Sequence, residues 1–352
     1  MEISATTATL NTPVHVRPMP SGHWLDRSQP NALNAFRLAL ALAVIFSHAT
    51  VFAESGISES RYSVGAIAVN GFFIISGFLI TGSWLKDPNR YLRARVLRIW
   101  PGFCVAFLFS LGIAAAFSGE RWLAYLRAVR PSGIAEGLLF LDPRVLQRGE
   151  AFALSPFAHQ INGPMWTIAI EFLCYLAVAI AGVTGILQKR WFVVTFFAAM
   201  LLFAFRNVQT DATGWGAESW PRFASCFGGG VVLYLFKERV PQHWLLGAIS
   251  LLFLMLSYSN RWFVVITPIF GTYFIFWAAY SVPRWLKTIG SRNDISYGVY
   301  LYAFPLQQAY WQLSQWNYLP QSLFSHLAMT ALGAIGLGWA SWILVEKPTH
   351  RR

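Results

Sequence analysis

The sequence contains few charged residues and few cysteines, and both shortages limit what the protein can be. Only 12% of its 352 residues are Asp, Glu, Lys or Arg, whereas 56% are hydrophobic. This composition excludes an ordinary soluble globular chain and indicates an integral membrane protein. The cysteines Cys104, Cys174 and Cys226 lack a metal-binding spacing. We therefore predict no metal site and interpret each cysteine as a small buried hydrophobic residue.

The first 30 residues lack the apolar stretch of a signal peptide, and the whole chain lacks visible internal repeats. We expect residues 1–30 to form a poorly ordered cytoplasmic tail and residues 31–352 to form one membrane domain. The net charge of +12 would suit nucleic acid binding. Because the basic residues instead cluster in short gaps between apolar runs, we predict contact with lipid headgroups and no nucleic acid partner.

Ten apolar stretches are candidates to cross roughly 30 Å of hydrocarbon, although the sixth and seventh are short. The sequence therefore predicts an all-α, polytopic bundle of about ten transmembrane helices. Basic residues concentrate in alternate gaps, which places both termini in the cytoplasm by the positive-inside rule. The gap at 119–163 holds five arginines and is an exception. The stretches are 34–53, 63–85, 101–118, 164–186, 191–206, 222–236, 243–259, 262–281, 294–314 and 323–345.

Two ionisable residues, Arg37 and His48, share the first predicted span. Their spacing corresponds to roughly 16 Å of rise and about 20° of rotation on a helix, so they lie on one face. Ionisable residues inside a membrane indicate a functional site. His48 and Glu171 have similar predicted depths, and an imidazole paired with a carboxylate suits proton abstraction from a hydroxyl. Alternatively, Glu171 hydrogen-bonds a neighbouring helix or contacts lipid headgroups.

Arginines also gather at the predicted cytoplasmic face, where Arg37 is joined by Arg93, Arg95 and Arg98. Arg95 and Arg98 are three residues apart and share a helical face. Such a group binds phosphates through charge-assisted hydrogen bonds. Positive-inside topology alone is the alternative explanation.

Small residues interrupt the bulky second span, and polar residues interrupt the ninth. The small residues either allow close helix packing or form a slot for a thin ligand. In the ninth span, a mid-helix proline frees a backbone carbonyl, so its phenols and amides are candidates to line a polar cavity for a sugar. A kink with interfacial tyrosines is the alternative. These residues are Gly71, Ser76, Gly77 and Gly82, then Tyr297, Tyr300, Tyr302, Pro305, Gln307 and Gln308.

Six segments in order resemble the integral membrane acyltransferase 3 family, the bacterial acyl-CoA-dependent O-acyltransferases. They are NAFRLALALAVIFSHA, NGFFIISGFLITGSWL, RARVLRIWPGF, NGPMWTIAIEFLCYL, SYGVYLYAFPLQQ and VEKP. The resemblance covers roughly residues 30–350. It implies a multi-pass protein of the bacterial inner membrane that transfers an acyl group, here expected to be acetyl. The donor would be acyl-CoA (acetyl-CoA), a co-substrate rather than a bound cofactor, and the acceptor a hydroxyl of a glycan or lipid-linked glycan.

The resemblance also implies site residues. The arginine and histidine that the family requires match Arg37 and His48, and its tryptophan–glutamate stretch matches Trp166 and Glu171. Two positions depart from the family pattern, because many members have Asp where Asn70 stands and His where Ala303 stands. Some members carry an additional hydrolase-like domain. We expect this chain to act without one.

Together these observations predict a reaction channel. We expect the coenzyme phosphates to bind Arg37, Arg95 and Arg98, with the pantetheine arm beside Ser76 and Gly77. His48 would act as the base, oriented by Glu171, and an acyl-histidine intermediate is a variant. The predicted acceptor-binding residues are Asn162, Trp166, Tyr300 and Gln307. A transporter of a glycan or lipid-linked intermediate, or a sensor or scaffold, is the competing hypothesis. The acceptor's identity and the oligomeric state stay open.

Overall fold

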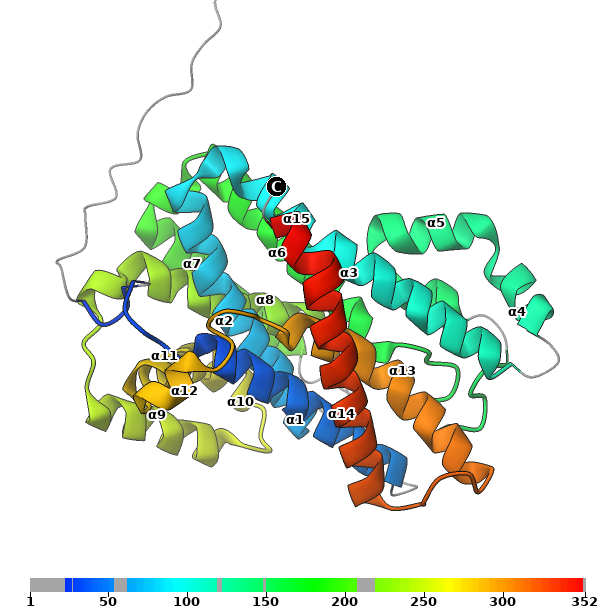
Figure 1. Ribbon diagram of the computed structural model, residues 1–352. Coiled ribbons are helices and arrows are strands. Elements are labelled where there is room, and N and C mark those ends of the chain that lie inside the picture. Colours follow the sequence, from blue (N-terminus) through cyan, green and yellow to red (C-terminus); the bar gives the residue numbers. More distant parts are fainter. Residues whose placement is uncertain are drawn as a thin grey trace, which may run out of the picture.

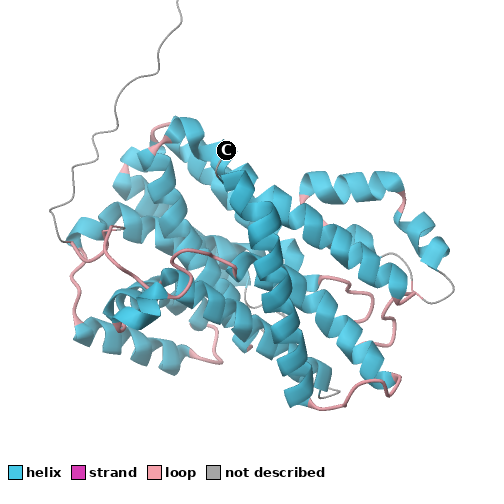
Figure 2. Ribbon diagram, viewed as in Figure 1, coloured by secondary structure: helices cyan, strands magenta, loops and turns pink. Residues whose placement is uncertain are grey.

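The computed structural model describes residues 23–26, 28–53, 62–118, 122–147, 150–207 and 219–350. Every regular element in these ranges is helical, as predicted (Figure 1, Figure 2). Most of the predicted N-terminal tail, residues 1–22 and 27, lies outside the described residues. The helices are α1 Leu33–Ala53, α2 Val64–Lys86, α3 Pro88–Ala116, α4 Trp122–Val129, α5 Pro131–Phe140, α6 Trp166–Val183, α7 Arg190–Asn207, α8 Trp220–Phe236, α9 Trp244–Ser257, α10 Phe263–Ile266, α11 Thr272–Ser281, α12 Arg284–Thr288, α13 Ser296–Gln315, α14 Leu323–Ser341 and α15 Lys347–His350.

Each of the ten predicted spans corresponds to a helix or to a helical segment. The span predicted at 262–281 consists of α10, a π-helical turn at Thr267–Gly271 and α11. Within the described residues, seven helices are long and apolar enough to cross a membrane. Helices α8 and α9 are shorter, with 17 and 14 residues, and α13 carries many polar side chains. The protein is therefore a multi-pass membrane protein.

The helices extend beyond the predicted apolar stretches in two places. Helix α3 begins at Pro88 rather than at residue 101, because Asp87 caps its first turn and the helix continues through Pro101. The arginine-rich stretch consequently lies on the helix itself. The gap at 119–163 contains helices α4 and α5, which hydropathy missed because 8 and 10 residues are too few to span the bilayer.

The segment before α1 packs against the bundle. Leu25 is fully buried, and the indole Nε1 of Trp24 donates a hydrogen bond to the carbonyl oxygen of Val240 at 2.8 Å. Asn34, in the first turn of α1, donates to the carbonyl oxygen of Gly290 at 2.9 Å. The packed part of the chain therefore begins before residue 31.

Helix α2 is central to the bundle and packs most extensively against α8. The two backbones approach so closely that a Cβ on Gly77 would lie 2.0 Å from the carbonyl oxygen of Phe227. On the facing helix, a Cβ on Gly230 would lie 2.2 Å from the carbonyl oxygen of Ile74. The glycines are thus packing residues, and the face of Gly77 is covered by α8. Close helix packing, the first alternative predicted for these small residues, is therefore observed at Gly77, and a ligand beside the second span stays a prediction.

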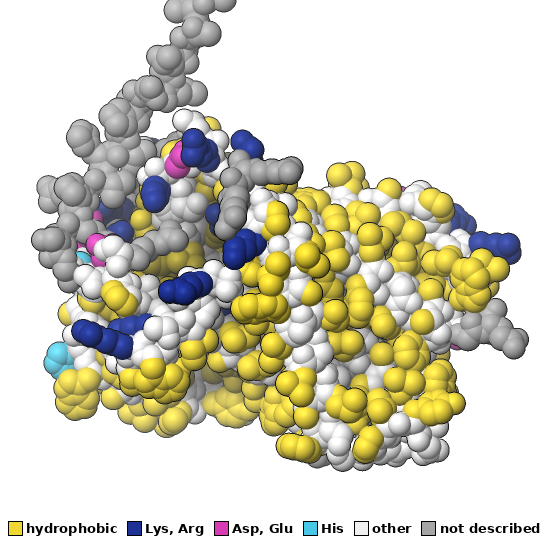
Figure 3. All heavy atoms as spheres, viewed as in Figure 1, with side chains coloured by type: hydrophobic (Ala, Val, Ile, Leu, Met, Phe, Trp, Pro, Cys, Tyr) yellow, Lys and Arg dark blue, Asp and Glu magenta, His cyan; other side chains and the backbone are white. Residues whose placement is uncertain are grey.

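The outer surface of the bundle is apolar over most of the face shown in Figure 3, and lysine and arginine side chains gather mainly towards one end. Helices α7, α9 and α14 present large exposed hydrophobic residues, including Phe196, Leu202, Leu252, Met255 and Leu332. Exposed apolar side chains on long helices are expected to face lipid.

Replacing Gly77 with alanine should destabilise the bundle, because the added methyl group overlaps the backbone of α8. Overpacking of this kind costs about 1–3 kcal/mol, against a gain of about 0.5–1 kcal/mol from better helix propensity. Gly112→Ala on α3 is the matched control, since among the described residues no atom outside the backbone of its own helix turn lies within 4 Å of its Cβ position. We expect the midpoint of thermal unfolding in detergent to fall for Gly77→Ala only. Equal midpoints for the two variants would contradict the packing role.

Candidate active site

Arg37 and Arg98 converge on shared carboxylates. Arg37 of α1 and Arg98 of α3 both bind Asp294, and the Arg98 Nη2 lies 2.8 Å from Asp294 Oδ2. The Arg98 Nη1 also lies 3.3 Å from Glu346 Oε2. Glu346 belongs to a π-helical turn, Trp342–Glu346, that follows α14. Four segments distant in sequence therefore meet in one largely buried charge cluster, which we call the arginine cluster: Arg37, Arg98, Asp294 and Glu346.

Asp294 stands in the loop before α13, and its environment strongly favours the ionised form. Burial raises its pKa, but the charges of Arg37 and Arg98 and two hydrogen bonds from Ser296 outweigh this and lower the pKa to about 2. The Ser296 hydroxyl donates to Asp294 Oδ1 at 2.6 Å. Asp294 is thus an anion at neutral pH that fixes both guanidinium groups.

Sequence reasoning missed both acids of the arginine cluster. The signal for Asp294 was an isolated acid after Arg292 in a basic gap, and the signal for Glu346 was its place in the VEKP segment. Each guanidinium has five N–H donors, so these ion pairs do not saturate Arg37 and Arg98. Arg95 lies one turn before Arg98 and is partly buried, whereas Arg93 is exposed.

His48 lies near the other end of α1 in aromatic surroundings and is only 4% exposed. Its ring makes nearly perpendicular contacts with Phe157 and Phe304, at centroid distances of 5.6 and 5.0 Å. Phe52, one turn further along α1, contacts the same two phenylalanines. The imidazole thus packs among phenylalanine rings, and we call the group formed by His48, Phe52, Phe157 and Phe304 the aromatic chamber.

Glu171 does not form the predicted contact with His48. Its Oε1 accepts hydrogen bonds from the Ser76 hydroxyl at 2.5 Å and from the Tyr175 hydroxyl at 2.6 Å. The Tyr91 hydroxyl donates to the carbonyl oxygen of Tyr175 at 2.9 Å, so the network links α2, α3 and α6. Similar depth in the membrane does not set the direction in which a side chain points around its helix. A catalytic role for Glu171 stays a prediction.

The effect predicted for Pro305 is observed, although α13 continues through it without a break. Proline has no N–H, so the carbonyl oxygen four residues earlier, on Leu301, loses its helical partner. The Asn162 Nδ2 donates to that oxygen at 2.9 Å and also to the Ser110 hydroxyl at 2.9 Å. The side-chain oxygen of Asn162 is buried without a hydrogen-bond partner among the described residues.

Two of the other predicted acceptor-binding residues, Tyr300 and Gln307, belong to α13. The hydroxyls of Tyr300 and Thr167 lie 2.9 Å apart. The Gln307 amide donates to the carbonyl oxygen of Ile45 at 2.8 Å, and its own oxygen is buried without a partner among the described residues. Trp166 is different, because its ring contacts Phe223 of α8. The structure thus brings Asn162, Tyr300 and Gln307 to α13 and holds Trp166 beside α8.

The two positions that depart from the family pattern are both inside the bundle. Asn70 is 1% exposed, and its side-chain oxygen is buried without a hydrogen-bond partner in the part of the chain described. Ala303 is 3% exposed. Neither residue supplies an ionisable group, so the titrating chemistry at this site depends on other side chains.

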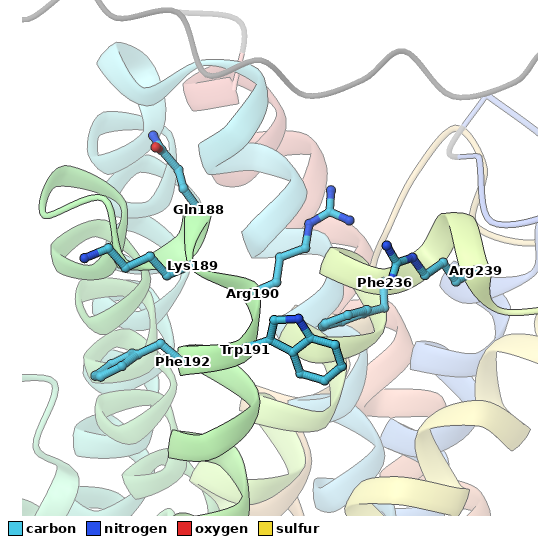
Figure 4. A pocket seen from close by; sticks show the side chains of 7 residues that line it. All are labelled: Gln188, Lys189, Arg190, Trp191, Phe192, Phe236 and Arg239. Carbon is cyan, nitrogen blue, oxygen red and sulfur yellow. The ribbon is translucent and has the colours of Figure 1, made fainter.

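A separate cavity of about 370 Å³ opens between the start of α7 and the end of α8 (Figure 4). Lys189, Arg190 and Arg239 line it together with the rings of Trp191 and Phe236. Cations beside exposed aromatic rings are typical of the membrane interface. The cavity joins two basic gaps that the topology prediction places on one side, and none of the predicted site residues lines it.

The structure is an apolar helix bundle that contains a buried charge cluster and a buried imidazole. Comparison with known proteins gives the family. The acyltransferase domain matches residues 31–345, and the chain therefore belongs to the acyltransferase 3 family, as its sequence segments predicted. It is a membrane O-acyltransferase. Membership favours the acyltransferase prediction over the transporter alternative.

Two curated proteins resemble the chain over most of their lengths. An O-acetyl transferase of Shigella phage Sf6 is 28% identical over 339 residues, covering 90% of this chain and 95% of that protein. Nodulation protein 10 of Rhizobium leguminosarum bv. viciae is 23% identical over 370 residues, covering 91% and 93%. No solved structure gives a significant match.

Replacing Asp294 with asparagine should destabilise the protein at neutral pH. Removing one partner of a buried ion pair costs about 3–5 kcal/mol, because the remaining charges lose their compensation. The ordinary Asp pKa of about 3.9 is lowered here to about 2. The stabilisation by ionised Asp294 is therefore complete above about pH 4 and disappears as the pH falls towards 2.

Asp142→Asn is the matched control, because the Asp142–Arg144 pair, at 2.7 Å, lies near the surface. An exposed pair contributes about 0–1 kcal/mol. Thermal unfolding in detergent at pH 7 should show a clearly lower midpoint for Asp294→Asn and a nearly unchanged one for Asp142→Asn. A stable Asp294→Asn protein would show that the arginine cluster does not depend on this carboxylate.

Proposed function

We propose that this protein is an O-acetyltransferase of the bacterial inner membrane, with both termini in the cytoplasm. It transfers an acetyl group from acetyl-CoA to a hydroxyl of a glycan or lipid-linked glycan. The observation that carries the proposal is the arrangement of α1, which has Arg37 in the arginine cluster near one end and His48 in the aromatic chamber near the other. The similarity to a phage O-acetyl transferase supports acetyl as the transferred group.

In the proposed reaction, the phosphates of acetyl-CoA bind at the arginine cluster. Within the described part of the chain, the ion pairs of Arg37 and Arg98 use only some of their N–H donors, and partly buried Arg95 adds a third cation. Eleven residues of helix separate Arg37 from His48, roughly 16 Å of rise. An extended pantetheine arm covers a separation of this order, so a coenzyme anchored at the arginines can present its thioester to the imidazole.

His48 then acts as the general base. Its imidazole removes the proton of the acceptor hydroxyl, the hydroxyl oxygen attacks the thioester carbonyl, and coenzyme A leaves as the thiolate, which takes up the proton. The aromatic rings around His48 limit access of water, which would otherwise compete as acceptor. Glu171 is hydrogen-bonded to Ser76 and Tyr175, and we propose that it shapes the channel wall rather than orienting His48 directly.

His48→Ala should abolish acetyl transfer while the protein still folds. General-base catalysis contributes about 10²–10⁴-fold to rates, so we expect at least a hundredfold loss. The assay follows label from radioactive acetyl-CoA into envelope glycan in purified membranes. His243→Asn is the control, because His243 is exposed and an asparagine retains its capping of α9. Near-normal transfer by His48→Ala would refute the assignment.

Arg98→Lys should weaken binding of acetyl-CoA but not of acetyl-pantetheine, which lacks the coenzyme's phosphates. Loss of a charge-assisted hydrogen bond costs about 1.5–3 kcal/mol, or roughly 10- to 100-fold in Kd. Arg90→Lys on the same helix is the control, since Arg90 is exposed and pairs only with Asp87 among the described residues. Equal weakening for both ligands would indicate a structural role for Arg98 and remove the phosphate site.

A further inference from the structure

We infer that His326 is a positioning residue for the acceptor: its imidazole hydrogen-bonds a hydroxyl of the glycan that His48 deprotonates. This inference rests on the proposed function, and no segment of the family resemblance contains His326. The residue lies in the first turn of α14 and is 4% exposed. Its Nε2 is buried without a hydrogen-bond partner among the described residues.

The His326 ring adjoins the aromatic chamber of His48. It stacks on Phe52 with centroids 5.1 Å apart and an interplanar angle of 30°. Phe52 also contacts Phe157 and Phe304, the two rings against which His48 packs. Two successive phenylalanine rings, Phe304 or Phe157 and then Phe52, therefore connect the two imidazoles, which come from helices near opposite ends of the chain.

The position of His326 along the channel favours the acceptor over the donor. Phe52 follows His48 by one turn on α1, in the direction away from Arg37. The imidazole stacked on Phe52 consequently lies beyond His48 as seen from the arginine cluster. The donor is anchored at the arginines, so a ligand that reaches His48 from the far side is the acceptor.

The chemistry of the site suits a sugar. The His326 ring also contacts Tyr310, at a centroid distance of 4.6 Å. The Tyr310 hydroxyl is already used, donating to the carbonyl oxygen of Pro320 at 2.8 Å. Apolar walls with a few polar groups are typical of small-molecule sites. Leaving a buried nitrogen unpaired is unfavourable, and a glycan hydroxyl would supply the missing partner.

Two substitutions of His326 distinguish the hydrogen-bonding role of Nε2 from the packing role of the ring. His326→Phe keeps an aromatic ring between Phe52 and Tyr310 but removes Nε2, whereas His326→Gln keeps a polar group near the Nε2 position. The assay uses purified protein, acetyl-CoA and deacetylated envelope polysaccharide from cells lacking the gene. We expect His326→Phe to raise the KM for polysaccharide about 3- to 10-fold with an unchanged KM for acetyl-CoA. His326→Gln should recover much of the loss, and His243→Asn should behave as wild type.

Other results would overturn the inference. An unchanged polysaccharide KM in His326→Phe would show that the nitrogen does not bind the acceptor. An equal loss for both substrates together with a lower unfolding midpoint would show a structural role for the ring. Failure of the proposed function is distinct, because the wild-type protein itself would then transfer no acetyl group to the polysaccharide.

Discussion

Compensation of the buried arginines is the constraint on which the rest of this structure depends. A guanidinium in an apolar interior is costly unless carboxylates and hydrogen bonds replace its water. Arg37 and Arg98 satisfy this requirement only because the loop before α13 brings Asp294 and the turn after α14 brings Glu346. The arginine cluster therefore fixes the relative positions of α1, α3, α13 and α14. It also orients the guanidinium groups of Arg37 and Arg98 beside each other.

The opposite end of α1, which carries His48, has a different kind of environment. Phe157 and Phe304 pack against His48, and the Gln307 amide donates to the backbone carbonyl of Ile45 one turn earlier on α1. One helix thus connects a region of compensated charge with an aromatic region. In the proposed reaction this division places anion binding and proton transfer at separate sites, so that the arginines do not lie beside the base.

Helix α13 shows how polar groups are accommodated within the bundle. Pro305 removes one backbone donor, and Asn162 takes the carbonyl of Leu301 that this leaves. Tyr300 and Gln307 bind groups on other segments in the same way. Because these side chains bind protein groups rather than pointing at lipid, a helix with many polar residues is stable in the interior.

The sequence by itself determined the helical class, the approximate bounds of the ten helical segments and the separation of Arg37 and His48 along one helix. A membrane of fixed thickness makes these one-dimensional properties, which hydropathy and helical rise express directly. Only tertiary packing decided in which direction each side chain points around its helix, and which residues distant in sequence pair with each other. For this reason Glu171 binds Ser76 and Tyr175 instead of His48, α8 covers Gly77, and Asp294 joins two arginines that lie some 200 residues or more before it. Contacts of this kind arise from the three-dimensional arrangement of helices, which no local pattern of residues specifies.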